Sequence, residues 1–73
     1  MKKLSTVNVL EIVEGTPAQL VSFEDTKEGN EMAEELFGNL MIENGGSLLD
    51  IEIAIEDGEF SSGTYSVFII HST

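Results

Sequence analysis

Two stretches near the start of the chain are rich in residues that favour β-strands. The first, residues 6–14, is TVNVLEIVE and stops at Gly15-Thr16-Pro17, which continues neither a helix nor a strand ladder. The second, residues 18–25, is AQLVSFED and returns to β-forming residues after that short gap. The pattern predicts two strands joined as a hairpin.

The spacing of apolar residues changes between residues 28 and 43. Asp25, Thr26 or Asn30 can cap the start of a helix there, and residues 44–46, Asn-Gly-Gly, accept the left-handed conformation that ends one. The apolar residues recur at the spacing of one helical face, which predicts a helix. They are Met32, Ala33, Leu36, Phe37, Leu40 and Met41.

Aliphatic and acidic residues alternate through residues 48–60, LLDIEIAIEDGEF. A period of two residues predicts a third strand, with the acids facing away from the helix and the aliphatic row facing it. A fourth strand is predicted over residues 64–73, TYSVFIIHST. The aliphatic row of the third strand consists of Leu49, Ile51, Ile53 and Ile55.

The connection between the last two predicted strands has two solutions. Asp57-Gly58 is a strong signal for a two-residue hairpin turn. Such a turn would place Glu56 opposite Glu59, and like charges directly opposed on a sheet are unfavourable. We therefore favour a wider loop over residues 57–63 or a bulged hairpin.

The order strand, strand, helix, strand, strand predicts an α+β fold with one helix packed on one face of a four-stranded antiparallel sheet. A right-handed crossover through the helix lets the third strand pair with the first, which gives the spatial order 2-1-3-4 and leaves strands 2 and 4 as edges. Seventy-three residues predict a single domain spanning 1–73, with no room for a separate catalytic domain.

The charge balance narrows the class of partner. Fourteen acidic residues against three basic ones give a formal net charge of −11. Nucleic acids, nucleotides and anionic membranes bind clustered Lys and Arg, so the sequence disfavours direct binding of these ligands. An acidic excess attracts positively charged partners, and we expect the basic surface of another protein.

Seven acids on the predicted helix and third strand form a candidate partner-binding surface. One interpretation is a solvated surface; the other is a carboxylate array that fits the cationic cleft of a nucleic-acid-binding protein. In size and charge the chain resembles small inhibitors encoded by phages and mobile elements against host nucleases, a resemblance of profile without a shared motif. The seven are Glu28, Glu31, Glu34, Glu35, Asp50, Glu52 and Glu56.

The last predicted strand is uncharged apart from His71 and apolar on both faces. As an edge strand it would lack protection against pairing, so the sequence predicts a homodimer, or a partner that adds to this strand or to the outer sheet face. The alternative is that this strand is central and buried. The predicted self-association residues are Tyr65, Val67, Phe68, Ile69 and Ile70.

Catalytic chemistry is present only in fragments. The chain has no cysteine and a single histidine, His71, so neither a metal site nor a nucleophile–base pair is complete, and we expect a non-enzymatic protein without cofactors. A signal-peptide core is interrupted by Asn8, Glu11 and Glu14, and no stretch approaches the roughly 20 apolar residues of a membrane span. We therefore expect a cytoplasmic protein.

Overall fold

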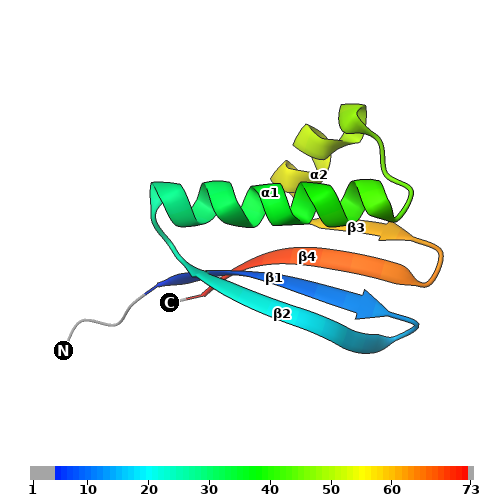
Figure 1. Ribbon diagram of the computed structural model, residues 1–73, viewed down its shortest axis with the longest axis horizontal. Helices are drawn as coiled ribbons and strands as arrows, with labels where there is room; N and C mark the ends of the chain where they lie inside the picture. Colours follow the sequence, from blue (N-terminus) through cyan, green and yellow to red (C-terminus); the bar gives the residue numbers. More distant parts are fainter. Residues whose placement is uncertain (1–4, 73) are drawn as a thin grey trace.

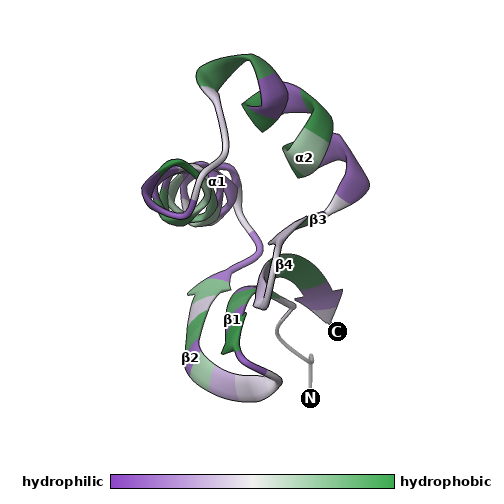
Figure 2. Cartoon of the chain, turned by 90° about the vertical axis from the view of Figure 1, so that its right-hand side faces the viewer, coloured by the Kyte–Doolittle hydropathy of each residue, from purple (hydrophilic) through white to green (hydrophobic). Residues whose placement is uncertain are grey.

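A computed structural model describes residues 5–72 and confirms an α+β fold with a four-stranded antiparallel sheet. Two helices, not one, lie on the same side of the sheet, and no helix among residues 5–72 covers the other side (Figures 1 and 2). The elements are β1 (Thr6–Val13), β2 (Thr16–Glu24), α1 (Lys27–Glu43), the 3-10 turn η1 (Leu48–Asp50), α2 (Ile51–Asp57), β3 (Glu59–Ser62) and β4 (Tyr65–Ser72).

The predicted hairpin of the first two strands is confirmed. Glu14 and Gly15 both have positive φ, 52° and 79°, as a two-residue turn of the primed type requires. They join the paired residues Val13 and Thr16, so β2 begins two residues earlier than predicted. Pro17 is tolerated inside β2 because this strand is an edge of the sheet and its pairing with β1 is bulged there.

The predicted long helix is confirmed as α1. Thr26 is its N-cap, and the Thr26 Oγ1 accepts a hydrogen bond of 3.0 Å from the Gly29 amide. Asn44 is the C-cap, and Gly45 follows with a φ of 100°. Of the three candidate N-caps, Asp25, Thr26 and Asn30, the structure selects Thr26, and the predicted helix end at residues 44–46 is confirmed.

The predicted third strand is wrong, because residues 48–57 form η1 and α2. Ile51, Ala54 and Ile55 recur at i, i+3 and i+4, so the same letters also fit one face of a helix, and these residues are the ones turned inward. Ile53 is exposed, whereas the strand prediction placed it in the core. Gly58, with a φ of 80°, ends α2 and donates its amide to the Ala54 carbonyl at 2.8 Å, so Asp57-Gly58 is a helix end and not a hairpin turn.

The strand order 2-1-3-4 is also corrected: the sheet runs β2-β1-β4-β3. Residues 59–62, predicted as loop, form the short edge strand β3, and a two-residue turn containing Gly63 joins the paired residues Ser62 and Tyr65. Since residues 48–57 are helical, β4 takes the place beside β1. The alternative of a central last strand is therefore confirmed, and β4 is not an edge.

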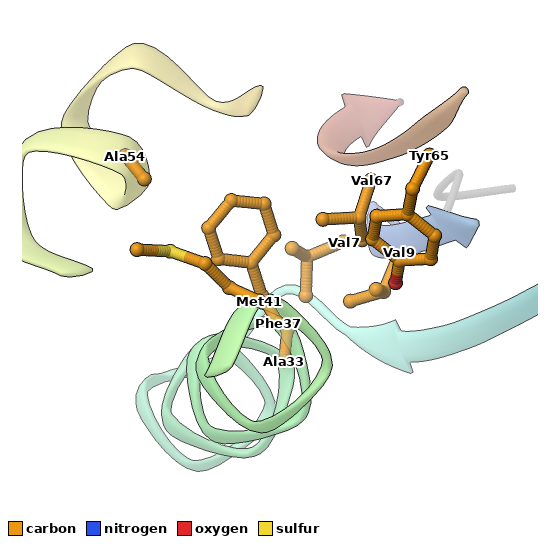
Figure 3. Close-up of a cluster of buried hydrophobic side chains, with 8 residues drawn as sticks. All are labelled: Val7, Val9, Ala33, Phe37, Met41, Ala54, Tyr65 and Val67. Atoms are coloured by element: carbon orange, nitrogen blue, oxygen red, sulfur yellow. The ribbon is translucent and has the colours of Figure 1, made fainter. Parts of the chain in front are cut away.

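The hydrophobic core lies between the helices and one face of the sheet (Figure 3). The aromatic ring of Phe37 and the side chain of Met41 extend from α1 towards the strands and α2, and both are fully buried. The opposite sheet face contributes no buried side chain. The buried residues are Val7 and Val9 of β1, Ala33, Phe37 and Met41 of α1, Ala54 of α2, and Tyr65 and Val67 of β4.

Candidate interaction surfaces

The four predicted acids of α1 are exposed on the sides of the helix that do not face the sheet. Glu28, Glu31 and Glu35 recur at i, i+3 and i+7, which aligns them in one stripe. Glu34 is one turn before Gly38, where α1 approaches the Ile51 side chain of α2. The α1 acids therefore extend from the outer side of this helix to the flank facing α2.

The three acids predicted on the third strand lie instead on η1 and α2. Glu52 and Glu56 are exposed at i and i+4, and Asp50 accepts a hydrogen bond of 2.8 Å from the Ser47 hydroxyl. The prediction directed these acids away from the long helix, and the structure places them on the same side of the sheet as α1. The seven predicted acids, called here the acidic helical surface, are Glu28, Glu31, Glu34, Glu35, Asp50, Glu52 and Glu56.

Little positive charge accompanies this surface. Lys27 is the only lysine or arginine among residues 5–72. Within that range one ion pair is present, between the Nδ1 of His71 and the Oδ2 of Asp25 at 3.8 Å, and it carries charge only when the histidine is protonated. Neither His71 nor Asp25 belongs to the acidic helical surface. The carboxylates of that surface therefore form no ion pair with any residue in the range 5–72.

Three large aliphatic side chains are exposed among the α2 acids. Leu48, Leu49 and Ile53 are 77%, 88% and 62% exposed. Leu49, Glu52, Ile53 and Glu56 occupy i, i+3, i+4 and i+7, so aliphatic and acidic residues alternate along one outward stripe. Figure 2 shows hydrophobic and hydrophilic residues alternating along the chain in α2. Sequence reasoning missed this α2 aliphatic patch (Leu48, Leu49 and Ile53), because the period-two interpretation assigned two of its members to the core.

The predicted self-association residues lie on two faces of the sheet. Tyr65 and Val67 are buried beneath the helices, and Ile69, on the same face, is partly buried. Phe68 and Ile70 point to the face that no described helix covers, where Ile70 is 44% exposed. Only these last two belong to an accessible sheet surface.

Strand pairing brings further apolar residues onto that uncovered face. Leu10 is directly paired with Leu20 on one side and with Phe68 on the other, and Leu20 is 64% exposed. The sequence places Leu10 and Ile12 on one apolar face of the first strand, but it did not indicate Leu20, because the alignment of these residues depends on the register of three strands. The bare sheet face is defined here by its apolar residues Leu10, Ile12, Leu20, Phe68 and Ile70.

One polar contact is partly buried on the opposite, helix-facing side of the sheet. The Tyr65 hydroxyl donates a hydrogen bond of 2.8 Å to the Oε2 of Glu11. Burial raises the pKa of Tyr65 well above its ordinary value, and the hydrogen bond to Glu11 and the negative charges of Glu11 and Glu43 raise it further. The phenol is therefore held in its protonated form as a donor.

Metal-ligand clustering, a surface hollow and His71 are features of the described residues that bear on chemistry. No group of three or more His, Cys, Asp or Glu among residues 5–72 is arranged to hold a metal ion. A hollow of about 190 Å³ lies between the end of β2 and the start of α1. The exposed His71 is not one of its lining residues, although its partner Asp25 lies between the lining residues Glu24 and Thr26. The lining residues are Phe23, Glu24, Thr26, Glu28, Gly29 and Met32.

Comparisons with known proteins add no relative. No protein-family model, curated protein or solved structure matches this chain. No helix within residues 5–72 has the length and apolar character needed to cross a membrane. Functional argument therefore depends on the surfaces described above.

Proposed function

We propose that this protein is a non-enzymatic binding module whose acidic helical surface engages a basic surface on another protein. The observation that carries the proposal is the α2 aliphatic patch, in which the exposed Leu49 and Ile53 alternate with Glu52 and Glu56. Acids that serve solubility alone need no exposed leucine among them. An exposed group of large aliphatic side chains that is rimmed by polar residues is instead typical of protein–protein interaction sites.

The arrangement supports binding of a short amphipathic helix in a groove. Residues of one helix stripe at i, i+3, i+4 and i+7 are the anchors in that mode of recognition. Because Glu52 and Glu56 alternate with Leu49 and Ile53, the matching groove has an apolar floor and Lys or Arg at its rim. The carboxylates would accelerate association and exclude acidic partners, and the aliphatic side chains would slow dissociation.

A nucleic-acid-binding protein is the partner class that this chemistry favours. Such proteins carry extended basic clefts, and the α1 acids would extend contact beyond the α2 stripe. Occupation of the cleft would block nucleic acid, so the proposed role is that of a small inhibitor, with a nuclease of host defence as one target of this kind. The formal charge of −11 supports such competition.

The test uses the proteins of a cell lysate that bind DNA-cellulose, because these carry the basic surfaces that the proposal requires. The protein is immobilised, this fraction is applied at low salt, and duplex DNA is added as a competitor. We expect capture that weakens with salt and that DNA reverses. The absence of DNA-reversible capture at low salt contradicts the proposal.

A pair of triple variants separates a specific surface from net charge. E31K/E35K/E52K reverses three acids of the acidic helical surface. E14K/E24K/E59K has the same net charge but changes acids outside that surface. We expect the first variant to lose capture by about tenfold or more, with a shallower salt dependence, and the control to retain it. Equal losses would mean that only total charge acts.

The variant L49S/I53S tests the aliphatic anchors. Both side chains are exposed, so their replacement should leave the fold intact, as circular dichroism will report. We expect capture to fall by about tenfold or more with an unchanged salt dependence. Binding equal to that of the wild type would show that the acids suffice and that the α2 aliphatic patch is not an anchor.

A further inference from the structure

The two edges of the sheet are poorly suited to pairing with another chain. β3 is only four residues long, and β2 carries Pro17 and a bulge in its pairing with β1. Short edge strands, prolines and bulges all protect sheet edges against strand addition. Association through the sheet is therefore favoured at its uncovered face.

The bare sheet face presents a continuous apolar row across three strands. Leu20, Leu10 and Phe68 are consecutive directly paired neighbours on β2, β1 and β4. Side chains that are directly opposite on neighbouring strands are in contact distance. Ile12 and Ile70 flank the row, two residues from Leu10 and Phe68 along their own strands, and Leu20 and Ile70 are the most exposed members.

Polar side chains on the same face already have partners within the chain. The Ser22 hydroxyl donates to the Asn8 Oδ1 at 2.6 Å, and the Asn8 Nδ2 donates to the Ile70 carbonyl at 3.1 Å. The hydroxyls of Ser61 and Ser66 are hydrogen-bonded to each other at 3.1 Å. Burying a polar group costs most free energy when its hydrogen bonds to water are not replaced. Because these groups are already hydrogen-bonded within the chain, another surface can cover this face at a small desolvation cost.

The distribution of charge selects the occupant. Among residues 5–72, the charged residues whose strand positions direct them to this face are Glu24 and Glu59, each on an edge strand. The acidic helical surface lies on the opposite side of the sheet. Two copies of a chain with a net charge of −11 repel each other in most relative orientations. When they pack through their bare sheet faces, their acidic helical surfaces are furthest apart, so this repulsion is smallest.

We propose that the bare sheet face is the interface of a homodimer, formed by two copies packed face to face about a twofold axis. An uncharged apolar patch is self-complementary, as an interface between identical surfaces requires. Leu20 and Ile70 would become buried against the partner copy. The proposal differs from the sequence-based prediction of self-association, since Tyr65, Val67 and Ile69 belong to the other face.

Sedimentation velocity of the purified full chain tests this inference. At tens of micromolar and physiological salt, we expect the mass of two chains. L20K should raise the dissociation constant by about 100-fold or more, because a lysine would be buried in an apolar interface. L49K is the matched control, since Leu49 is a still more exposed leucine on the helical side and its substitution makes the same change in charge.

Each outcome decides the question. A monomeric wild-type chain at these concentrations overturns the proposal, as does dissociation by L49K with an unaffected L20K, which would assign self-association to the α2 aliphatic patch. I70K serves as a second interface variant if circular dichroism shows that L20K is unfolded. The measurement involves no other protein, so its result is independent of whether the acidic helical surface binds a basic partner.

Discussion

The hydroxyl of Tyr65 donates a hydrogen bond of 2.8 Å to the carboxylate of Glu11 and thereby links β4 to β1 beneath the helices. Tyr65 is only 7% exposed, and its ring is part of the hydrophobic core. A carboxylate acceptor makes this bond stronger than one between two neutral groups. The contact therefore gives a specific polar link between the two central strands in a core that otherwise depends on apolar packing.

Removal of this hydroxyl should weaken the fold. We expect Y65F to lower the free energy of unfolding by about 1 kcal/mol, because the phenylalanine ring fills the same space but no longer donates to Glu11. Urea denaturation measured by circular dichroism checks the value. E11Q is the matched comparison, since its amide oxygen still accepts the hydrogen bond. It should lower the free energy of unfolding by less than Y65F does. A Y65F chain as stable as the wild type would show that the bond contributes nothing.

The same contact predicts a loss of stability in alkali. The pKa of Tyr65 is raised in the folded chain above its ordinary value of 10.0. Above pH 10 the unfolded chain loses the phenolic proton while the folded chain keeps it, so unfolding releases a proton. Stability is therefore complete below pH 10 and falls as pH rises, by up to about 1.4 kcal/mol per pH unit.

Y65F separates this effect from that of other groups that titrate in the same pH range. Urea denaturation of both chains between pH 8 and pH 11 should show a steeper decline for the wild type. Parallel curves would mean that Tyr65 has the same pKa in both states. Only the difference between wild type and Y65F in the pH dependence of the free energy of unfolding is needed, and not the absolute stability of either chain.

Two glycines of α1 should respond in opposite directions to alanine. At Gly38 a Cβ would meet the Ile51 side chain at 3.7 Å and 3.8 Å, which is ordinary contact, so G38A should stabilise by up to about 1 kcal/mol through helix propensity. At Gly29 a Cβ would overlap the Glu24 carbonyl, so G29A should destabilise by about 1–3 kcal/mol. Thermal unfolding of the two variants checks both. A destabilised G38A would mean that α1 and α2 pack more closely than described.

The hairpin and α1 were predictable because local chemistry decides them. Thr26 at the start of α1 and Asn44 at its end cap the helix wherever it packs. Gly15 likewise marks the turn between the first two strands, although the turn was predicted at residues 15–17 and forms at Glu14 and Gly15. In these segments the capping, the turn residues and the apolar period all indicate the same structure.

Residues 48–57 were not predictable in the same way. Their aliphatic residues fit a strand face when every second one is counted, and a helix face when Ile51, Ala54 and Ile55 are counted. The position of Ala54 distinguishes the two, since a small residue is needed where α2 packs beside Met41, and that need exists only in the folded chain. The error then displaced the candidate site, because Leu49 and Ile53 moved from the predicted core to the surface.

A pair of glutamate substitutions tests the helical assignment. I53E should change the free energy of unfolding by no more than about 0.5 kcal/mol, because Ile53 faces solvent in α2. A54E should cost at least about 3 kcal/mol, because it places a charge in the core without a partner. Urea denaturation of both variants gives the comparison. In a strand the order would be reversed, with I53E the more damaging substitution.

Salt should stabilise this protein, because repulsion between like charges opposes its folding. Glu28 and Glu31, Glu31 and Glu35, and Glu52 and Glu56 are neighbours three or four residues apart on their helices, and like-charge pairs at this spacing are unfavourable by about 0.2–0.5 kcal/mol each. Sodium chloride reduces the screening length from about 10 Å at 0.1 M to about 3 Å at 1 M. We expect the free energy of unfolding to rise by about 1 kcal/mol over that range.

The variant E31Q/E35Q removes two of these three pairs, Glu28 with Glu31 and Glu31 with Glu35. It should therefore be more stable than the wild type at low salt and gain less from added salt. The control E14Q/E59Q makes the same change in net charge at residues outside the helices. If both variants lose the salt response equally, the response comes from total charge. If the stability of the wild type does not change with salt, repulsion between the acids of the acidic helical surface does not oppose folding, because water alone screens them.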